Sequence, residues 1–259
     1  MPETDIYLSI IIPAYNEAAR LPKMLRRVNE YLAERPFTYE IIVVLDGPSD
    51  DTREVLGALA STVNNLLVLD CKTNRGKGRT VKRGMLAAHG RIRLFSDADN
   101  STDISHFDKM IPLFERDFDV VIGSRHSRDA PGAGQEMPQV WSRRLMGSMG
   151  NLLIRLLAVR GIRDTQCGFK AFRDYAAEKI FSQTVIDRWG FDIEALALSR
   201  KLNYRIGVIP TRWVNDPRSH LKGRDYLSVL WETLRIQWNL FRGRYNLRRD
   251  ACQERMRKR

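Results

Sequence analysis

Short apolar runs alternate with helical patterns through the first half of this chain, and this alternation limits the possible folds more than any other feature. Runs that are apolar at almost every position are typical of strands covered on both faces. They predict strands at Ile6–Ile12, Tyr39–Leu45, Leu66–Leu69, Ile92–Phe95 and Val120–Ile122. Because amphipathic stretches of helical period separate them, we expect a mostly parallel sheet with helices on both faces.

Polar side chains follow four of these strands, at the point where each strand ends. Asn16 and Glu17 follow the first, Asp46 the second, Asp97-Ala98-Asp99 the fourth and Arg125 the fifth. Ligands of open parallel sheets bind at the carboxyl ends of the strands. The sequence therefore predicts one site to which all four strand ends contribute.

Asp97 and Asp99 are the strongest candidates for chemistry in that site. Two carboxylates one residue apart after a buried strand can both reach a hard cation, and Mg²⁺ or Mn²⁺ prefers such oxygen ligands. The alternative is a polar turn that caps a helix starting near Ile104, for which Asp103 is a suitable residue. Because three other strand ends carry related side chains, we favour a metal site at Asp97 and Asp99.

The charge and cysteine content limit the partners and the compartment. The chain has 259 residues and a formal net charge of +12, which favours an anionic partner such as a nucleotide, a phospholipid surface or nucleic acid. Its three cysteines, Cys71, Cys167 and Cys252, show no metal-ligand spacing and fit a reducing compartment. No secretion signal follows Met1, and no apolar run reaches the roughly 18 residues of a membrane span. We expect a cytoplasmic protein that is soluble or lies on a membrane surface.

The C-terminal segment differs from the rest of the chain. Tyr226–Phe241 places leucines and aromatic residues at helical spacing, which is most often the pattern of a core-facing helix. Arg242–Arg259 then holds eight Lys or Arg against two acids, a surplus of six positive charges. An aromatic amphipathic helix followed by a basic tail is typical of an interfacial membrane anchor. We therefore divide the chain into an α/β domain, residues 1–222, and a membrane-surface segment, residues 223–259. A solvated tail or a tail that binds nucleic acid is the alternative for the end of the chain.

The motifs resemble those of glycosyltransferase family two, the inverting sugar-nucleotide enzymes with a Rossmann-like A-type fold. They are Pro13–Glu17, Asp46-Gly47, Asn74 with Gly76-Lys77-Gly78, Asp97-Ala98-Asp99, Gly123-Ser124-Arg125, Asp164–Lys170 and Phe191–Glu194. The last three resemble the polyprenyl-phosphate branch, which contains dolichyl-phosphate glucosyl- and mannosyltransferases, and Asp164–Lys170 is closer to the glucosyl members. The family usually has two acids before the glycine after the second strand, where this chain has Leu45-Asp46.

The resemblance implies transfer of a hexose, with glucose favoured, from a nucleotide sugar to polyprenyl or dolichyl phosphate, with Mg²⁺ or Mn²⁺ as cofactor. Asp97, Asp99 and Arg125 are the implied catalytic residues. Lys77 would approach the diphosphate, with Gly76 and Gly78 allowing close backbone contact. The implied nucleotide-sugar-binding residues are Pro13, Tyr15, Glu17, Asp46, Lys77, Asp97, Ala98, Gln166 and Asp192.

The acceptor side needs cations rather than a base. A phosphate monoester is already largely a dianion at neutral pH, since its second pKa is about 6. The resemblance implies that its phosphate is held by Arg125, Arg143, Arg144, Arg218 and Lys222. A solvated helix face is the alternative for Arg143 and Arg144. A membrane surface and a membrane-embedded protein are the other partners to expect.

Three competing functions stay open at this stage. The same lipid could receive mannose from GDP-mannose. A family-two enzyme with a non-lipid glycan acceptor would need a catalytic carboxylate, for which Asp192 or Glu194 is available. A non-catalytic basic binding module would account for the tail alone. Phosphodiester backbones are bound by cationic side chains, whereas three of the four strand ends carry acids. No nucleic-acid partner is therefore expected.

Overall fold

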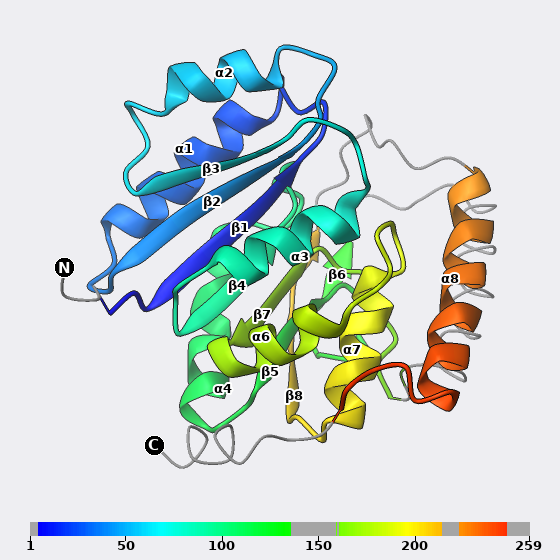
Figure 1. The fold of residues 1–259 in the computed structure, drawn as a ribbon. Helices are drawn as coiled ribbons and strands as arrows, with labels where there is room; N and C mark the ends of the chain where they lie inside the picture. Colours follow the sequence, from blue (N-terminus) through cyan, green and yellow to red (C-terminus); the bar gives the residue numbers. More distant parts are fainter. Residues whose placement is uncertain (1–4, 136–158, 160, 214–222, 248–259) are drawn as a thin grey trace.

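Seven strands form one sheet in the computed structural model, which describes residues 5–135, 159, 161–213 and 223–247 (Figure 1). Their order is β3-β2-β1-β4-β7-β5-β8. The strands are β1 (Leu8–Ala14), β2 (Tyr39–Asp46), β3 (Leu66–Cys71), β4 (Ile92–Ser96), β5 (Val120–Ser124), β7 (Phe169–Arg173) and β8 (Ile206–Pro210). A small second pair joins β6 (Gly134–Gln135) to β9 (Arg212–Trp213).

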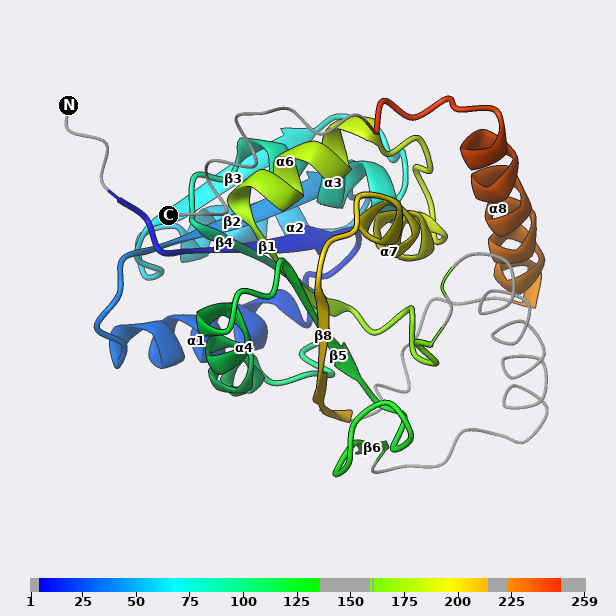
Figure 2. The same ribbon diagram turned by 90° about the horizontal axis from the view of Figure 1, so that it is seen from below.

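Helices cover both faces of this sheet, as the alternating pattern predicts. One face carries α1 (Leu21–Ala33), α2 (Thr52–Leu59), the 3₁₀ helix η1 (Ile104–Lys109) and α4 (Ile111–Glu115). The other carries α3 (Lys77–Ala87), α6 (Asp174–Gln183) and α7 (Phe191–Lys201), and Figure 2 shows the sheet between the two layers. Along β1, Ile10 and Ile12 pack toward α1 while Ile11 packs toward α3 and α6, as the two-residue period of a strand requires.

The five strands predicted in the first half of the chain are confirmed, with small shifts at their ends. A strand is also expected from the sequence at Tyr204–Ile209, where β8 forms, but the central strand β7 was missed. Phe169–Arg173 forms β7, antiparallel to both β4 and β5, in a segment for which no strand was predicted. Lys170 broke the apolar pattern by which the other strands were found. Its side chain is nevertheless fully buried, because it pairs with Asp192.

The capping alternative considered for this edge holds for Asp103 alone. Asp103 Oδ1 accepts a hydrogen bond from Ser105 N at 3.0 Å and so caps η1. Asp97 and Asp99 are not used in this cap. They remain available for a ligand at the end of β4.

Helix α8 (Gly223–Phe241) lies on the side of the molecule toward which the carboxyl ends of β1 and β2 point (Figures 1 and 2). Its inward face includes Val229, Ile236 and Glu232, which are buried. Its outward face is a stripe of large apolar side chains that are 51% to 86% exposed: Leu227, Trp231, Leu234, Trp238 and Phe241. Among the described residues, no helix is long and apolar enough to cross a membrane.

Candidate active site

The turn after β1 is tied to the turn after β2. Asn16 adopts a left-handed backbone conformation with φ of 55°, and its Oδ1 accepts a hydrogen bond from Ser49 N at 2.8 Å. Glu17 N donates to Thr52 Oγ1 at 2.8 Å. The predicted nucleoside-pocket residue Tyr15 lies beside this junction and is 42% exposed. Its ring is therefore available for stacking on a base or ribose.

Glu17 is held by a cation, although its surroundings disfavour its charge. Arg20 Nε and Nη2 each donate to the Glu17 carboxylate at 2.5 Å. Burial, together with the negative charges of Asp99 and Asp97, raises the pKa of Glu17 to about 7 despite Arg20. Glu17 thus belongs to the same electrostatic cluster as the two aspartates after β4.

Asp46 organises the loop that leads into α3. Its two carboxylate oxygens accept hydrogen bonds from Arg75 N and Gly76 N, both at 2.9 Å. A carboxylate has about four acceptor positions, so the predicted contact with a nucleotide base would be additional to this structural role. The next residue must be a glycine. Gly47 has a φ of 61°, and a Cβ there would lie 2.6 Å from Asn74 N.

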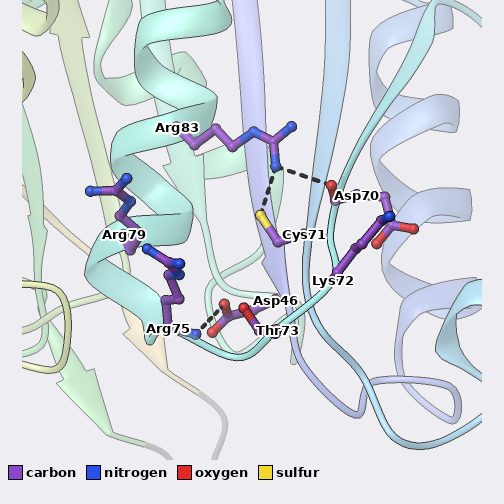
Figure 3. A pocket seen from close by; sticks show the side chains of 8 residues that line it. All are labelled: Asp46, Asp70, Cys71, Lys72, Thr73, Arg75, Arg79 and Arg83. Carbon is purple, nitrogen blue, oxygen red and sulfur yellow. Dashed lines mark hydrogen bonds between the residues drawn. The ribbon is translucent and has the colours of Figure 1, made fainter.

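Asp46 also lines a cationic hollow of about 370 Å³ between β3 and the start of α3 (Figure 3). Its other lining residues are Asp70, Cys71, Lys72, Thr73, Arg75, Arg79 and Arg83. Arg83 Nη1 donates to Cys71 Sγ at 2.8 Å. Four cations against two acids make this hollow attractive to an anion.

Lys77, the first residue of α3, reaches the aspartate cluster. Its Nζ lies 2.6 Å from Asp97 Oδ1. Burial acts to lower the pKa of Lys77, but the charges of Asp97 and Asp192 outweigh it and raise that pKa. The neighbouring glycines Gly76 and Gly78 are also required by packing within the protein. A Cβ at Gly76 would lie 2.5 Å from Asp187 O, and a Cβ at Gly78 would lie 2.5 Å from Ile186 O. The backbone of Ile186–Asp187 therefore occupies the space that side chains at these two glycines would need.

Asp97 and Asp99 stand at the end of β4 with few protein partners. Asp99 Oδ1 accepts from Ser101 N at 2.9 Å, and burial, followed by the charge of Asp97, raises the pKa of Asp99. Asp97 Oδ1 is paired with the Lys77 ammonium at 2.6 Å, which offsets one of the two neighbouring negative charges. The raised pKa of Asp99 shows that negative charge remains in excess beside Lys77, and a divalent cation bound by the two carboxylates would offset it.

The two aspartates fit a Mg²⁺ or Mn²⁺ ion that takes its remaining ligands from outside the protein. Within the described part of the chain, no group of three His, Cys, Asp or Glu side chains is arranged to hold a metal. Magnesium is commonly bound by one or two carboxylates together with substrate phosphates and waters. The predicted ligand pair is consistent with that mode of binding.

Asp192 is paired with a lysine that the sequence analysis did not select. Lys170 Nζ on β7 donates to Asp192 Oδ1 at 2.6 Å and to Cys167 O at 2.5 Å. Burial raises the pKa of Asp192 against the opposing charge of Lys170. The signal for Lys170 was its place in the Asp164–Lys170 motif, where a charged residue sits between apolar neighbours.

Arg125 is held in a fixed orientation by Asp164. Its Nε and Nη2 donate to the two Asp164 oxygens at 2.8 and 2.7 Å, and its backbone N–H donates to Oδ2 at 2.7 Å. Burial acts to lower the pKa of Arg125, but the charge of Asp164 outweighs burial, and the net effect is a raised pKa. Asp129 positions this carboxylate in turn, since its Oδ2 accepts from Asp164 N at 2.9 Å. No local pattern indicates that Asp164, 39 residues away, is the partner of Arg125.

The structure brings Glu17, Lys77, Asp97, Asp99 and Asp192 into one electrostatic cluster at the strand ends. Of the other predicted residues, Pro13 lies at the end of β1, Ala98 is buried between the two aspartates, and Gln166 is exposed. The predicted acceptor cations Arg143, Arg144, Arg218 and Lys222 lie outside the described residues.

The chain is similar in sequence and in fold to known proteins. A family model described as "Glycosyl transferase family 2" matches residues 9–181. A dolichyl-phosphate beta-glucosyltransferase of Dictyostelium discoideum is 37% identical over 232 residues, covering 85% of this chain and 70% of that protein. The Homo sapiens protein of the same name is 32% identical over 254 residues, covering 90% and 78%.

A solved structure of glucosyl-3-phosphoglycerate synthase from Mycobacterium tuberculosis, in complex with Mg²⁺ and uridine diphosphate, matches with a TM-score of 0.64. The match covers 89% of this chain and 78% of that one at 16% identity. At this identity the likeness concerns the fold. It confirms the expected Rossmann-like A-type glycosyltransferase fold.

Proposed function

This chain belongs to glycosyl transferase family 2, and we propose that it transfers glucose from UDP-glucose to dolichyl phosphate, with inversion at C1 of the sugar. The observation that carries this proposal is the identity of 37% and 32% to two proteins named dolichyl-phosphate beta-glucosyltransferase, over most of the chain. The cluster at the strand ends supplies the chemistry that such a transfer needs.

The donor side needs positive charge where the diphosphate leaves. Asp97 and Asp99 would hold Mg²⁺ or Mn²⁺, which supplies electrostatic stabilisation of the departing nucleoside diphosphate. Lys77 adds a cation of the protein's own, fixed 2.6 Å from Asp97 Oδ1. In this proposal Tyr15, Glu17 and Asp46 would bind the nucleoside. Asp192 and Gln166 would border the sugar.

The acceptor side needs orientation. A phosphate monoester dianion attacks without a general base, so the protein's task is to bring two anionic substrates together. Arg125 suits this because Asp164 fixes its guanidinium plane. An Arg that is already oriented loses little conformational entropy when it binds a phosphate.

The rival with a glycan acceptor has less support in the geometry. It requires a carboxylate free to take a proton. Asp192 Oδ1 accepts from Lys170, and the Glu194 carboxylate accepts from Val185 N, Ile186 N and Tyr245 Oη. Both acids are therefore engaged within the protein.

We also propose that the enzyme binds peripherally to the cytoplasmic face of a membrane through its C-terminal segment. The α8 stripe exposes two tryptophans, side chains that favour the membrane interface. The basic tail that follows suits anionic lipid. A lipid acceptor makes such placement useful, because the phosphate is then delivered beside the strand ends. A membrane-embedded partner protein is compatible with this arrangement.

A transfer assay tests the proposed reaction. Purified full-length protein is given a short-chain dolichyl phosphate, with Mg²⁺ or Mn²⁺, and UDP-glucose or GDP-mannose in parallel, with and without chelator. We expect chelator-sensitive formation of glucosyl-phosphoryl lipid from UDP-glucose. Product from GDP-mannose instead would identify a mannosyltransferase. Donor hydrolysis without lipid product would point to another acceptor.

A further inference from the structure

Glu232 links α8 to the donor side of the site, although it lies in no recognised motif. It is on the inward face of α8, 9% exposed, and its Oε2 accepts a hydrogen bond from Gly190 N at 2.7 Å. We propose that Glu232 is a positioning residue for donor binding. It fixes the segment Thr184–Gly190, against which the start of α3, with Lys77, packs. This inference rests on the proposed function, since it assigns Lys77 to the donor diphosphate.

The contact between Glu232 and Gly190 leaves no spare room. A Cβ on Gly190 would lie 2.9 Å from both Glu232 Cβ and Oε2. Gly190 directly precedes α7, which carries Asp192. A change at either residue therefore moves the start of α7 relative to α8.

A second tether joins the same segment to the chain just after α8. Tyr245 Oη donates to Glu194 Oε1 at 2.7 Å. Glu194 in turn accepts from Val185 N and Ile186 N, both at 3.0 Å. The segment Thr184–Gly190 is thus held from α8 itself and from the residues that follow it.

The opposite side of this segment is bonded to the start of α3. Arg79 N donates to Asp187 O at 3.0 Å, and Lys82 Nζ donates to Thr184 O at 2.7 Å. Gly76 and Gly78 lack a Cβ where one would meet the segment's backbone at 2.5 Å. The start of α3, with Lys77, therefore packs directly on the segment Thr184–Gly190.

A displacement of the segment Thr184–Gly190 would move the surroundings of Lys77. Its Nζ is 5.8 Å from the ring centre of Trp189 and 5.9 Å from that of Phe191, while it pairs with Asp97. If the segment shifts, the ammonium moves relative to the carboxylate that it neutralises. The expected consequence is weaker binding of a nucleoside diphosphate, with the lipid acceptor affected less.

The test compares Glu232→Ala and Glu232→Gln with the matched control Glu178→Ala, which removes an exposed glutamate of α6 far from this contact. For each full-length variant we would measure the Kd of UDP with Mg²⁺ by calorimetry, the KM for UDP-glucose, the KM for dolichyl phosphate, and Tm. Removing a group that orients a site residue typically costs at least about tenfold. Glu232→Ala should raise the Kd of UDP and the donor KM by about tenfold, with little change in lipid KM. Glu232→Gln keeps an acceptor for Gly190 N–H and should recover most of the loss.

A double-mutant cycle with Gly190→Ala examines the contact from its other side. If Glu232 acts through Gly190, the two substitutions should be non-additive in donor KM. Additive effects would overturn the proposal, as would a lowered Tm with UDP Kd unchanged, or equal rises in both KM values. Failure of the proposed reaction is distinguishable, because it would show as absent transfer by the wild-type protein while UDP binding still responded to Glu232→Ala.

Discussion

The carboxylate of Asp97 lies against the α-carbon of Gly168, so closely that a Cβ on the glycine would be 2.0 Å from Asp97 Oδ2. The two residues also share a main-chain hydrogen bond, from Asp97 N to Gly168 O at 3.1 Å. Gly168 does not have a positive φ, so space and not backbone conformation is the reason for the glycine. The residue before β7 thus fixes where a proposed metal ligand can stand.

Gly168→Ala should therefore abolish most activity without unfolding the protein. The added methyl group would push the Asp97 carboxylate away from Lys77 and from the proposed metal position. We expect transfer to fall by at least about tenfold and Mg²⁺ to bind more weakly, with an unchanged circular dichroism spectrum. Gly57→Ala is the control, because a Cβ there meets nothing within 4 Å and a helical Ala is about 0.5–1 kcal/mol more favourable than Gly. Wild-type Mg²⁺ dependence in Gly168→Ala would contradict the interpretation.

Asp99→Asn should remove metal-dependent transfer while leaving Tm the same or higher. Burial and the neighbouring Asp97 already disfavour the charged form of Asp99, as its raised pKa indicates. A neutral amide of the same shape removes that electrostatic cost but is a poor ligand for Mg²⁺. Transfer assays across a Mg²⁺ titration, together with thermal unfolding, would check both parts. Normal turnover in this variant would refute the metal role.

Metal affinity should fall as the pH is lowered below neutrality. The folded protein without metal keeps a proton on Asp99 above the ordinary pKa of 3.8, and burial raises the pKa of Glu17 to about 7. A cation must displace the proton of its ligand Asp99, and protonation of Glu17 removes a negative charge that favours the cation. Its apparent affinity is therefore full above the raised pKa values and is lost as the pH falls through them. Calorimetric Mg²⁺ titrations at about pH 5.5 and 7.5 measure this difference. In Glu17→Gln the pH dependence should be smaller; an unchanged profile would exclude Glu17 as a contributor.

Much of this arrangement was predictable from the sequence, for a physical reason. Each side chain that follows a parallel strand is carried to one edge of the sheet, so Glu17, Asp46, Asp97 and Asp99 were found from strand ends alone. The rest depends on pairings between distant segments. Lys170 reads as a polar interruption until Asp192, 22 residues away, neutralises it in the core.

Other features could not have been read from a pattern. Asp164 is 39 residues from Arg125, and Glu232 is 42 residues from Gly190, and neither spacing corresponds to a local motif. Gly76 and Gly78 were predicted to allow close contact with a diphosphate, and the structure adds that their missing Cβ atoms make room for the Ile186–Asp187 backbone. The sequence showed that small residues were required there without showing what occupied the space.

Substitution of Arg125 should weaken binding of the lipid acceptor more than binding of the nucleotide, and the variant must not destabilise the fold. Asp164 is buried, so Arg125→Ala leaves an unpaired buried carboxylate, which can cost about 3–5 kcal/mol of stability. Arg125→Lys keeps the charge and loses the two-pronged contact. We expect a raised KM for dolichyl phosphate in this variant, with the Kd of UDP within about twofold of wild type. Equal losses on both sides would remove Arg125 from the acceptor site.

The α8 stripe and the basic tail should contribute to membrane binding by different forces. Trp231→Ser/Trp238→Ser removes apolar area that is already exposed, so the fold should persist. Removing the tail is safest after Leu247, because Tyr245 donates to Glu194 and belongs to the folded domain. This truncation still deletes six of the eight basic residues beyond Phe241.

Co-sedimentation with anionic and neutral vesicles, at low and high salt, separates the two contributions. Screening weakens the tail's attraction, so the truncation should matter most at low salt on anionic vesicles. Apolar insertion is not screened, so the tryptophan variant should bind less under all four conditions. Leu67→Ser/Val68→Ser is the control, since these side chains are also exposed but lie on β3. Equal binding by wild type and the tryptophan variant would mean that the stripe is covered by something other than lipid.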